Sequence, residues 1–198
     1  MKKKTYEEVI REYPVTYELY ANMIDDGNRY EISDGVLELM SPSPTFTHQS
    51  ITYELQHVLN TSCRNEFIIV SSPIDVILSD TEVRQPDLVM IHKRRMPIIS
   101  NRGINGAPDL VVEVTSEHSR RRDKVRKRIV YAQYGVPEYW IVDLSNFTLE
   151  QYVLDEGRYE LTEVYADDDM IHSKTMPCAS FSMQEIVQNL PVPPDQLE

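Results

Sequence analysis

Apolar and polar residues alternate in some parts of the chain and follow a helical period in others. The stretch RYEISDGVLELM alternates on both sides of an Asp-Gly pair, which is typical of two antiparallel strands joined by a tight turn. From Thr47 onward the period becomes helical, with Ile51 and Leu55 on one face and Thr45 or Thr47 available to cap the first turn. A β-hairpin followed by a long helix is therefore predicted.

Short runs rich in β-branched residues predict the central strands, namely FIIVSSPIDVILS, VRQPDLVMI, LVVEVT and YWIV. A second helix should begin at Ser116 or Ser119 and end near Tyr134, because Gly135 follows it. Residues 5–26 have the spacing of a short helical entry, and the C-terminal part has that of further strands and a short helix. Together these elements predict an α/β (α+β) fold with a mixed central β-sheet flanked by helices.

The length of 198 residues and the 41% hydrophobic composition suit one compact domain over residues 1–198. We expect a helical segment and hairpin in 1–46, a core in 47–145, and strands with a short helix in 146–198. No apolar run approaches the roughly 20 residues that cross a bilayer. The start MKKKTYEEVIREYP also lacks the apolar core of a signal peptide. We therefore expect a cytoplasmic protein that makes no membrane contact.

The chain carries no zinc motif and no nucleotide-binding motif. Cys63 and Cys178 lie far apart and have no partner at metal-ligand spacing, so we expect two separate, buried and inert thiols. The five histidines form neither an HxH nor an HExxH pattern, and neither GxGxxG nor a phosphate-binding loop occurs. These absences argue against zinc-dependent hydrolysis and against the nucleotide-binding folds.

The formal net charge of -12 argues against a protein that binds nucleic acid over its whole surface. Positive charge is nevertheless concentrated in the stretch RRRDKVRKR, which begins at Arg120. Arg120, Arg121 and Arg122 are candidates for contacts to nucleic-acid phosphates. The alternative is an ordinary solvated helical face, as most charge runs are.

Two acids occur within the most strand-like segment, PDLVVEVT. Strand alternation places Asp109 and Glu113 on one face, and a second Pro-Asp pair ends in Asp87 just before another apolar strand. If the two strands are neighbours, these carboxylates converge, and converging carboxylates need a cation between them. An all-oxygen site suits Mg²⁺ or Mn²⁺. Such a site is typical of phosphodiester hydrolysis.

Several separated motifs resemble one nuclease family in their order and spacing. QPDLVMI, then GAPDLVVEVTSEHSRRRD, then YAQYGVPEYWIVD, preceded by RYEISDGVLELMSPSPTFTHQ, resemble the Uma-type endonuclease family of the PD-(D/E)XK superfamily. The resemblance covers most of the chain. It implies a restriction-endonuclease-like core, dependence on a divalent metal, and DNA as the substrate.

Carried over position by position, the resemblance assigns the two metal-binding acids of the motif to Asp87 and Glu113. The superfamily pattern expects Lys two residues after the second acid, where this chain has Thr115. In some branches the basic residue comes from the following helix, which makes Lys127 the first candidate and Lys124 the alternative. Lys127 lies one helical turn from both Asp123 and Tyr131, a stripe that can face the sheet.

Other polar residues have weaker claims to the site. Asp109 is a supporting candidate whose alternative role is to tie down the loop after Pro108. His48, at the start of the first long helix, is either a site residue or a capping or packing residue. Glu31 and Glu54 have the pattern of surface acids.

The sequence therefore predicts a metal-dependent DNA endonuclease that uses Mg²⁺ or Mn²⁺. One alternative is a catalytically inactive nuclease-fold module that binds DNA or another partner, which Thr115 and the negative charge would favour. A third hypothesis keeps the same residues and changes the substrate to RNA or another phosphodiester. We expect a homodimer, because cleavage of both strands of a duplex favours two-fold symmetry.

Overall fold

The computed structural model describes residues 14–41, 43–115 and 122–191. Within this part of the chain, six strands form the central sheet in the order β12-β11-β10-β9-β6-β3. Their bounds are β3 Phe67–Ser71, β6 Leu88–His92, β9 Leu110–Thr115, β10 Glu138–Asp143, β11 Thr148–Asp155 and β12 Arg158–Tyr165. β9 and β10 run parallel while the other neighbours run antiparallel, so the sheet is mixed, as predicted.

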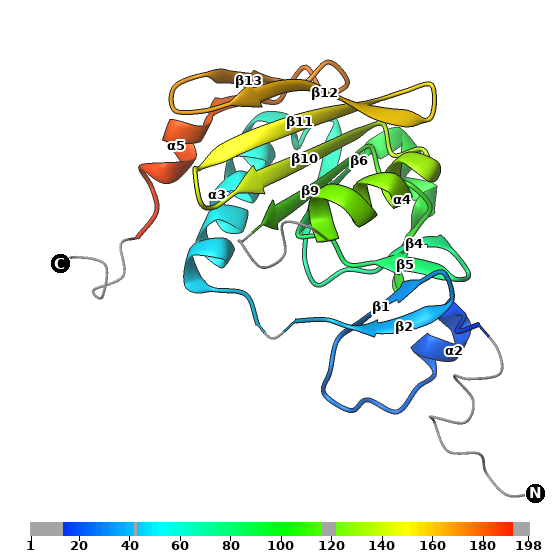
Figure 1. Cartoon of the computed structure of the whole chain (residues 1–198). Helices are drawn as coiled ribbons and strands as arrows, with labels where there is room; N and C mark the ends of the chain where they lie inside the picture. The colour runs from blue at the N-terminus through cyan, green and yellow to red at the C-terminus, as the bar shows by residue number, and fades with distance from the viewer. Residues whose placement is uncertain (1–13, 42, 116–121, 192–198) are drawn as a thin grey trace, which may run out of the picture.

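A second sheet lies beside the first and has the order β2-β1-β5-β4-β8-β7 within the described residues. Its strands are β1 Tyr30–Ser33, β2 Val36–Leu39, β4 Val76–Ser79, β5 Glu82–Arg84, β7 Ile99–Ser100 and β8 Gly103–Asn105. A short pair, β13 Met170–His172 and β14 Ser180–Ser182, follows near the C-terminal end. Figure 1 shows the second sheet below the central one.

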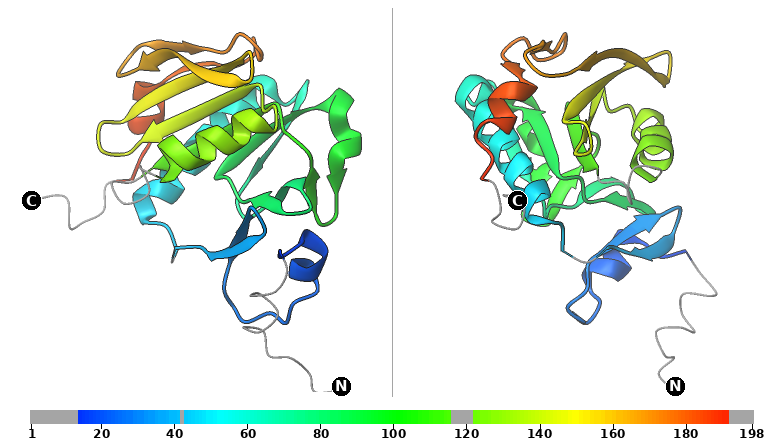
Figure 2. Two further views of the ribbon diagram at one scale, coloured as in Figure 1. Left: turned by 45° about the vertical axis from the view of Figure 1, so that its right-hand side comes forward. Right: turned by 60° about the vertical axis from the view of Figure 1, so that its left-hand side comes forward.

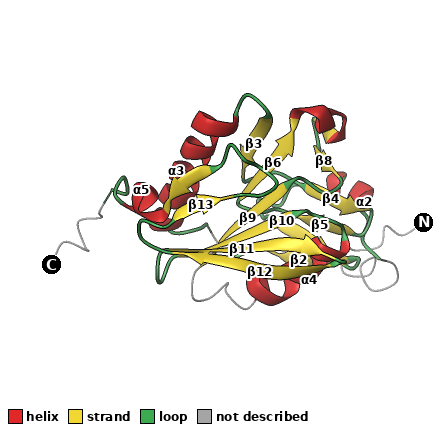
Figure 3. Ribbon diagram, turned by 90° about the horizontal axis from the view of Figure 1, so that it is seen from above, coloured by secondary structure: helices red, strands yellow, loops and turns green. Residues whose placement is uncertain are grey.

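Helices cover both faces of the central sheet, which confirms the predicted fold class (Figures 1 and 3). The helical segments are α2 Tyr17–Ala21, α3 Phe46–Cys63, the 3-10 segment η1 Lys93–Ile98, the π-helical segment η2 Arg122–Lys127, α4 Arg128–Gln133 and α5 Met183–Val187. On one face, α3 packs Ile51 and Leu55 against Val112 of β9. On the other face, Tyr131 of α4 packs against Val111 of β9 and Tyr139 of β10.

The predicted turn and cap chemistry is present at the N-terminal hairpin and at α3. Asp34 and Gly35 have φ angles of 49° and 74°, and β1 pairs with β2 in antiparallel register across this turn. A Cβ on Gly35 would lie 2.5 Å from Cβ of Pro14, so glycine is required for space as well as for φ. The side chain of Thr45 accepts a hydrogen bond from the backbone N–H of His48, which makes Thr45 the N-cap of α3.

Two predicted helices differ from the observed elements. Within the described part of residues 5–26, only Tyr17–Ala21 is helical, and residues 1–13 lie outside the description. The second predicted helix begins with the π-helical turn of η2 before the α-helical part, while the proposed caps Ser116 and Ser119 lie outside the described residues. Gly135, with φ 76°, ends α4 as predicted.

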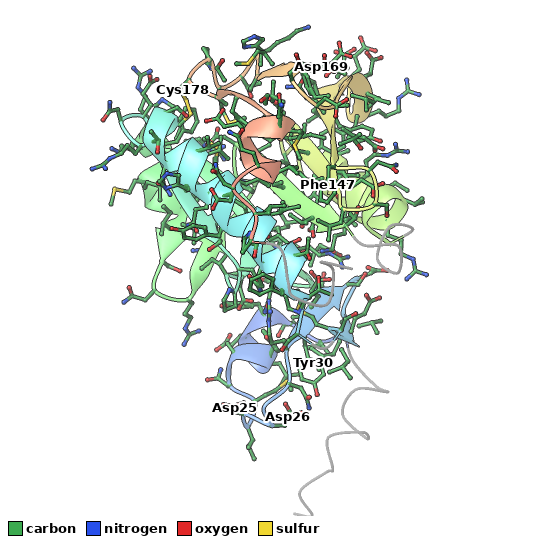
Figure 4. All side chains as sticks on the ribbon, turned by 90° about the vertical axis from the view of Figure 1, so that its left-hand side faces the viewer. Asp25, Asp26, Tyr30, Phe147, Asp169 and Cys178 are labelled. Atoms are coloured by element: carbon green, nitrogen blue, oxygen red, sulfur yellow. A yellow bond between two sulfur atoms is a disulfide. The ribbon has the colours of Figure 1, made fainter. Side chains whose placement is uncertain are left out.

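The prediction of two separate thiols was wrong. Cys63, at the end of α3, forms a disulfide with Cys178 in the segment between β13 and β14, although 115 positions separate them in sequence. Cys63 is 1% exposed, and Figure 4 labels Cys178 next to the end of α3. The bond joins the long helix to the C-terminal segment, whose Phe181 and Ile186 are buried against the α3 side of the core.

Within the described residues, no helix is long and apolar enough to cross a membrane.

Candidate active site

Glu113 lies in the middle of β9 and is only 3% exposed. Strand alternation turns Val112 and Val114 toward α3 and leaves Val111 and Glu113 on the α4 side. A carboxylate buried at this depth needs charged or hydrogen-bonding partners, because an unpaired one costs several kcal/mol or is protonated. The α4 side of the sheet supplies them.

Lys127 is the principal partner of Glu113. Its Nζ donates to Oε1 of Glu113 at 2.7 Å, and the Lys127 residue is only 2% exposed. One helical turn further on, the hydroxyl of Tyr131 donates to the same oxygen at 3.0 Å. Burial, followed by the charge of Glu113, raises the pKa of Tyr131 well above its usual value, so this hydroxyl keeps its proton. Lys127 therefore places an amine beside the second acid of the motif. Thr115, which occupies the usual lysine position, has no amine to offer.

Glu31 of β1 completes the surroundings of Lys127. Its Oε1 lies 3.4 Å from Nζ of Lys127 and accepts a hydrogen bond from the backbone N–H of Gln85 at 3.0 Å. Glu31 is 1% exposed, so the interpretation of this residue as a surface acid was wrong. Ile32 next to it is buried as well, because β1 lies between β2 and β5 and Ile32 packs with Ile77 and Val83 of the same sheet.

Arg84 of β5 links Glu31 to Glu82. Its guanidinium lies 3.4 Å from Oε2 of Glu31, forms an ion pair with Glu82, and donates to Oγ of Ser33 at 2.9 Å. Burial alone would lower the pKa of Arg84, but Glu31 and Glu82 outweigh it and raise the pKa above the usual value. Glu82 in turn accepts from the backbone N–H of Asp34, which fixes the hairpin turn.

We call Glu31, Glu82, Arg84, Glu113 and Lys127 the buried charge cluster. Within the described residues, it contains three carboxylates and two cations. Each member is at most 5% exposed. Charges in such surroundings are weakly screened and interact more strongly than surface pairs do.

Asp87 comes directly before β6 and reaches the same end of the sheet. The antiparallel register pairs Leu88 with Val112, and Oδ2 of Asp87 accepts from the backbone N–H of Val114 at 2.8 Å. Nε2 of His48, in the first turn of α3, lies 3.2 Å from the same oxygen. The structure therefore brings Asp87 and His48 together, beside the residues that flank Glu113.

Asp109 lies at the opposite end of β9, away from this cluster. Four residues separate it from Glu113, which corresponds to about 13 Å along a strand. Its Oδ2 accepts from the backbone N–H of His92 at 2.7 Å, and its Oδ1 accepts from Arg95 at 2.9 Å. Asp109 thus ties down the segment after β6.

The remaining predicted residues lie outside the structural description. Arg120 and Arg121 belong to residues 116–121, which are not described. Arg122 and Lys124 belong to the π-helical segment, but their side chains lie outside the description too. The contacts predicted for these four side chains stay predictions.

The donor set is suited to a hard divalent cation. Within the described ranges, no group of three or more His, Cys, Asp or Glu residues forms a ready-made cage. Mg²⁺ does not require one, because it usually takes one or two protein carboxylates together with water and substrate phosphate. Asp87 and Glu113 supply two carboxylates from neighbouring strands, β6 and β9, whose register pairs Leu88 with Val112. These residues therefore fit Mg²⁺ or Mn²⁺.

A mixed sheet between two helices, with acids of neighbouring strands at one end and a helical lysine beside them, has the architecture of a restriction-endonuclease-like protein. The chain belongs to the Uma2 family, described as "Putative restriction endonuclease", whose model matches residues 15–184. The match confirms the family resemblance of the sequence motifs.

One solved structure gives independent support for the fold. A crystal structure of a "putative nuclease belonging to DUF820" from Anabaena variabilis ATCC 29413 superimposes with a TM-score of 0.73 at 18% sequence identity. The match covers 90% of this chain and 100% of that one. A search of curated proteins finds no match.

Proposed function

We propose that this protein is a metal-dependent endonuclease that hydrolyses DNA phosphodiester bonds. The observation that carries the proposal is the buried contact between Lys127 and Glu113 at 2.7 Å. The motif of the superfamily needs an amine next to its second acid, and a strand with Thr115 at the usual position cannot provide it. The helix that follows the strand supplies the amine instead. Membership of the Uma2 family supports the same reaction class.

Asp87 and Glu113 would hold Mg²⁺ or Mn²⁺ through their carboxylate oxygens. When bound, the metal ion supplies a polarised scissile phosphate, a more acidic attacking water, and neutralisation of negative charge on the leaving oxygen. Two protein carboxylates leave room for water and for a substrate phosphate in the coordination of such an ion.

The side chains of the protein hold these groups in place. The amine of Lys127 lies 2.7 Å from Glu113 and 3.4 Å from Glu31. An ammonium there can orient a water molecule and donate a hydrogen bond to a phosphate oxygen as negative charge develops. The hydroxyl of Tyr131 fixes the rotamer of Glu113 and has no charge of its own. In the same way, Nε2 of His48 contacts Oδ2 of Asp87 and holds that carboxylate in place.

Cleavage of supercoiled plasmid in Mg²⁺ or Mn²⁺ tests the proposal. We expect wild-type protein to nick or linearise the plasmid and EDTA to abolish cleavage. Asp87→Asn and Glu113→Gln should lower the rate by about 100-fold or more, the usual scale for a group that stabilises transition-state charge. Glu160→Gln is the control, because it also removes a carboxylate charge but lies exposed on β12, the outer strand of the central sheet. It should retain most of the activity.

Two outcomes would overturn the proposal. One is the absence of cleavage by folded wild-type protein with either metal. The other is equal activity of the wild type and Glu113→Gln, which would indicate a contaminating nuclease. Binding of DNA without cleavage would favour the non-catalytic module instead. Cleavage of RNA in preference to DNA would keep the site and change the substrate. Homodimer formation stays a prediction that light scattering can check.

A further inference from the structure

One segment of this acidic chain contains basic residues but no acidic ones. Residues 88–108 contain none of the 32 acidic residues, although they contain four of the 20 lysines and arginines. Part of this segment is buried β6, so all four cations fall in the portion between β6 and β9. The chain as a whole has a formal net charge of -12, which makes an acid-free stretch with four cations unusual for it.

These cations lie on a projecting part of the molecule that we call the basic lobe, residues 93–105. It comprises η1, β7 and β8 and appears in green at the right of the left-hand view of Figure 2. Lys93, Arg94 and Arg102 are exposed, and Met96 between them is 61% exposed. The lobe therefore presents its positive charge to solvent.

The lobe is firmly attached at both ends. Arg95 donates to Asp109 at 2.9 Å and also to the carbonyl oxygen of Ala107, which anchors η1. At the other end, the backbone N–H of Ile104 donates to the carbonyl oxygen of Asp75 at 2.8 Å. A Cβ on Gly103 would lie 2.4 Å from that same oxygen, so β8 approaches β4 as closely as a backbone can. A fixed platform loses little conformational entropy when it binds a ligand.

Arg95 is thus structural, whereas the other three cations have no internal task. Among the described residues, no ion pair involves the side chain of Lys93, Arg94 or Arg102. Glu66 lies nearby, because its carbonyl oxygen accepts a hydrogen bond from the N–H of Lys93. Its carboxylate makes no ion pair within the described part of the chain. Unpaired cations on a rigid surface of an acidic protein suit a polyanion.

We propose that the basic lobe binds the phosphate backbone of duplex DNA at a distance from the cleavage site. The lobe begins six residues after Asp87, which corresponds to about 20 Å of extended strand. This length equals about six base pairs of B-form DNA at 3.4 Å each. On a duplex that runs along β6, Lys93 and Arg94 would therefore contact phosphates about half a helical turn from the phosphate at Asp87 and Glu113. The inference rests on the proposed function and adds a substrate contact to it.

Binding of a fluorescent 20-base-pair duplex, followed by anisotropy in EDTA between about 50 and 200 mM salt, tests the proposal without turnover. The test variant is Lys93→Ala/Arg94→Ala. We expect affinity at least about tenfold weaker at the lowest salt, and a plot of log affinity against log salt that is less steep by about 1.8. Arg102→Ala alone should reduce the slope by about 0.9.

The matched control is Arg158→Ala/Lys174→Ala, which removes two exposed cations elsewhere and changes the net charge equally. Its slope should equal that of the wild type. The lobe proposal is overturned if the Lys93/Arg94 variant keeps the wild-type slope, if both double variants lose the same slope, or if the wild type does not bind the duplex. The plasmid assay separates the two proposals. A cleaving wild type with a lobe-independent slope contradicts only the lobe, and lobe-dependent binding without cleavage contradicts only the endonuclease.

Discussion

Replacing Lys127 by methionine tests the electrostatics of the site most sharply. Methionine keeps most of the apolar side-chain volume but removes the charge, so Glu113 and Glu31 both lose a cation that lies close to them. Lys127 is 2% exposed and contacts these two acids, at 2.7 and 3.4 Å. Removing one partner of a buried ion pair typically costs about 3–5 kcal/mol. For a chain of this length, that corresponds to a fall in melting temperature of about 6–20 °C.

The same reasoning predicts an asymmetry between the two partners. Glu113→Gln leaves two carboxylates against two cations, and its amide oxygen can still accept from Lys127 and Tyr131. We expect it to cost no more than about 1–2 kcal/mol. The double variant Lys127→Met/Glu113→Gln should be more stable than Lys127→Met, because it removes the carboxylate that lay 2.7 Å from the lost ammonium group.

Urea unfolding at pH 7, followed by circular dichroism, measures these free energies for the wild type, both single variants and the double variant. Tyr131→Phe is a useful reference, because it removes one hydrogen bond to Glu113 without changing any charge. The account of the cluster is refuted if Lys127→Met costs less than about 1 kcal/mol. It is refuted equally if the effects of the two substitutions simply add.

Two further predictions concern other parts of the fold. Burial raises the pKa of Asp75 despite hydrogen bonds from Gln85 and Tyr17, so the folded state holds this proton to higher pH than the unfolded state does. The free energy of unfolding should therefore fall as pH rises above the usual Asp pKa of about 3.9. Asp75→Asn should remove this contribution to the dependence of the unfolding free energy on pH. The same pH dependence in the wild type and in Asp75→Asn would contradict the prediction. The disulfide closes a loop with a sequence separation of 115, so Cys63→Ser/Cys178→Ser should lower the free energy of unfolding by about 2–5 kcal/mol. Two thiols that titrate in unreduced, denatured protein, with a melting temperature unaffected by reductant, would show that no disulfide stabilises the fold.

Most of the fold could be predicted from the sequence because its signals are local. The Asp34-Gly35 turn, the Thr45 cap and the Gly135 stop each depend on residues within one turn of the chain. Alternation in β9 likewise predicted that Glu113 lies on the same face of the strand as Val111. The helical period predicted that Lys127 could face the sheet. The structure places Lys127 beside Glu113, although its catalytic role stays a prediction.

The features that sequence reasoning missed depend on contacts between distant segments. Glu31 looked like a surface acid because its partners, Arg84 and Lys127, lie 53 and 96 positions further along the chain. A signal was present, since the sequence EVR of β5 places an arginine in a strand, but only the strand order shows that β5 lies next to β1. The pairing of Cys63 with Cys178 was missed for the same reason.

The central claim is that Asp87 and Glu113 together bind a divalent metal ion beside Lys127. A crystal of the protein soaked in Mn²⁺ and measured at an anomalous wavelength tests it most directly. We predict an anomalous peak within coordination distance, about 2.0–2.2 Å, of oxygens from both carboxylates, and loss of that peak in Asp87→Asn crystals. A well-ordered site with no peak, or a peak bound by other residues, would contradict the claim.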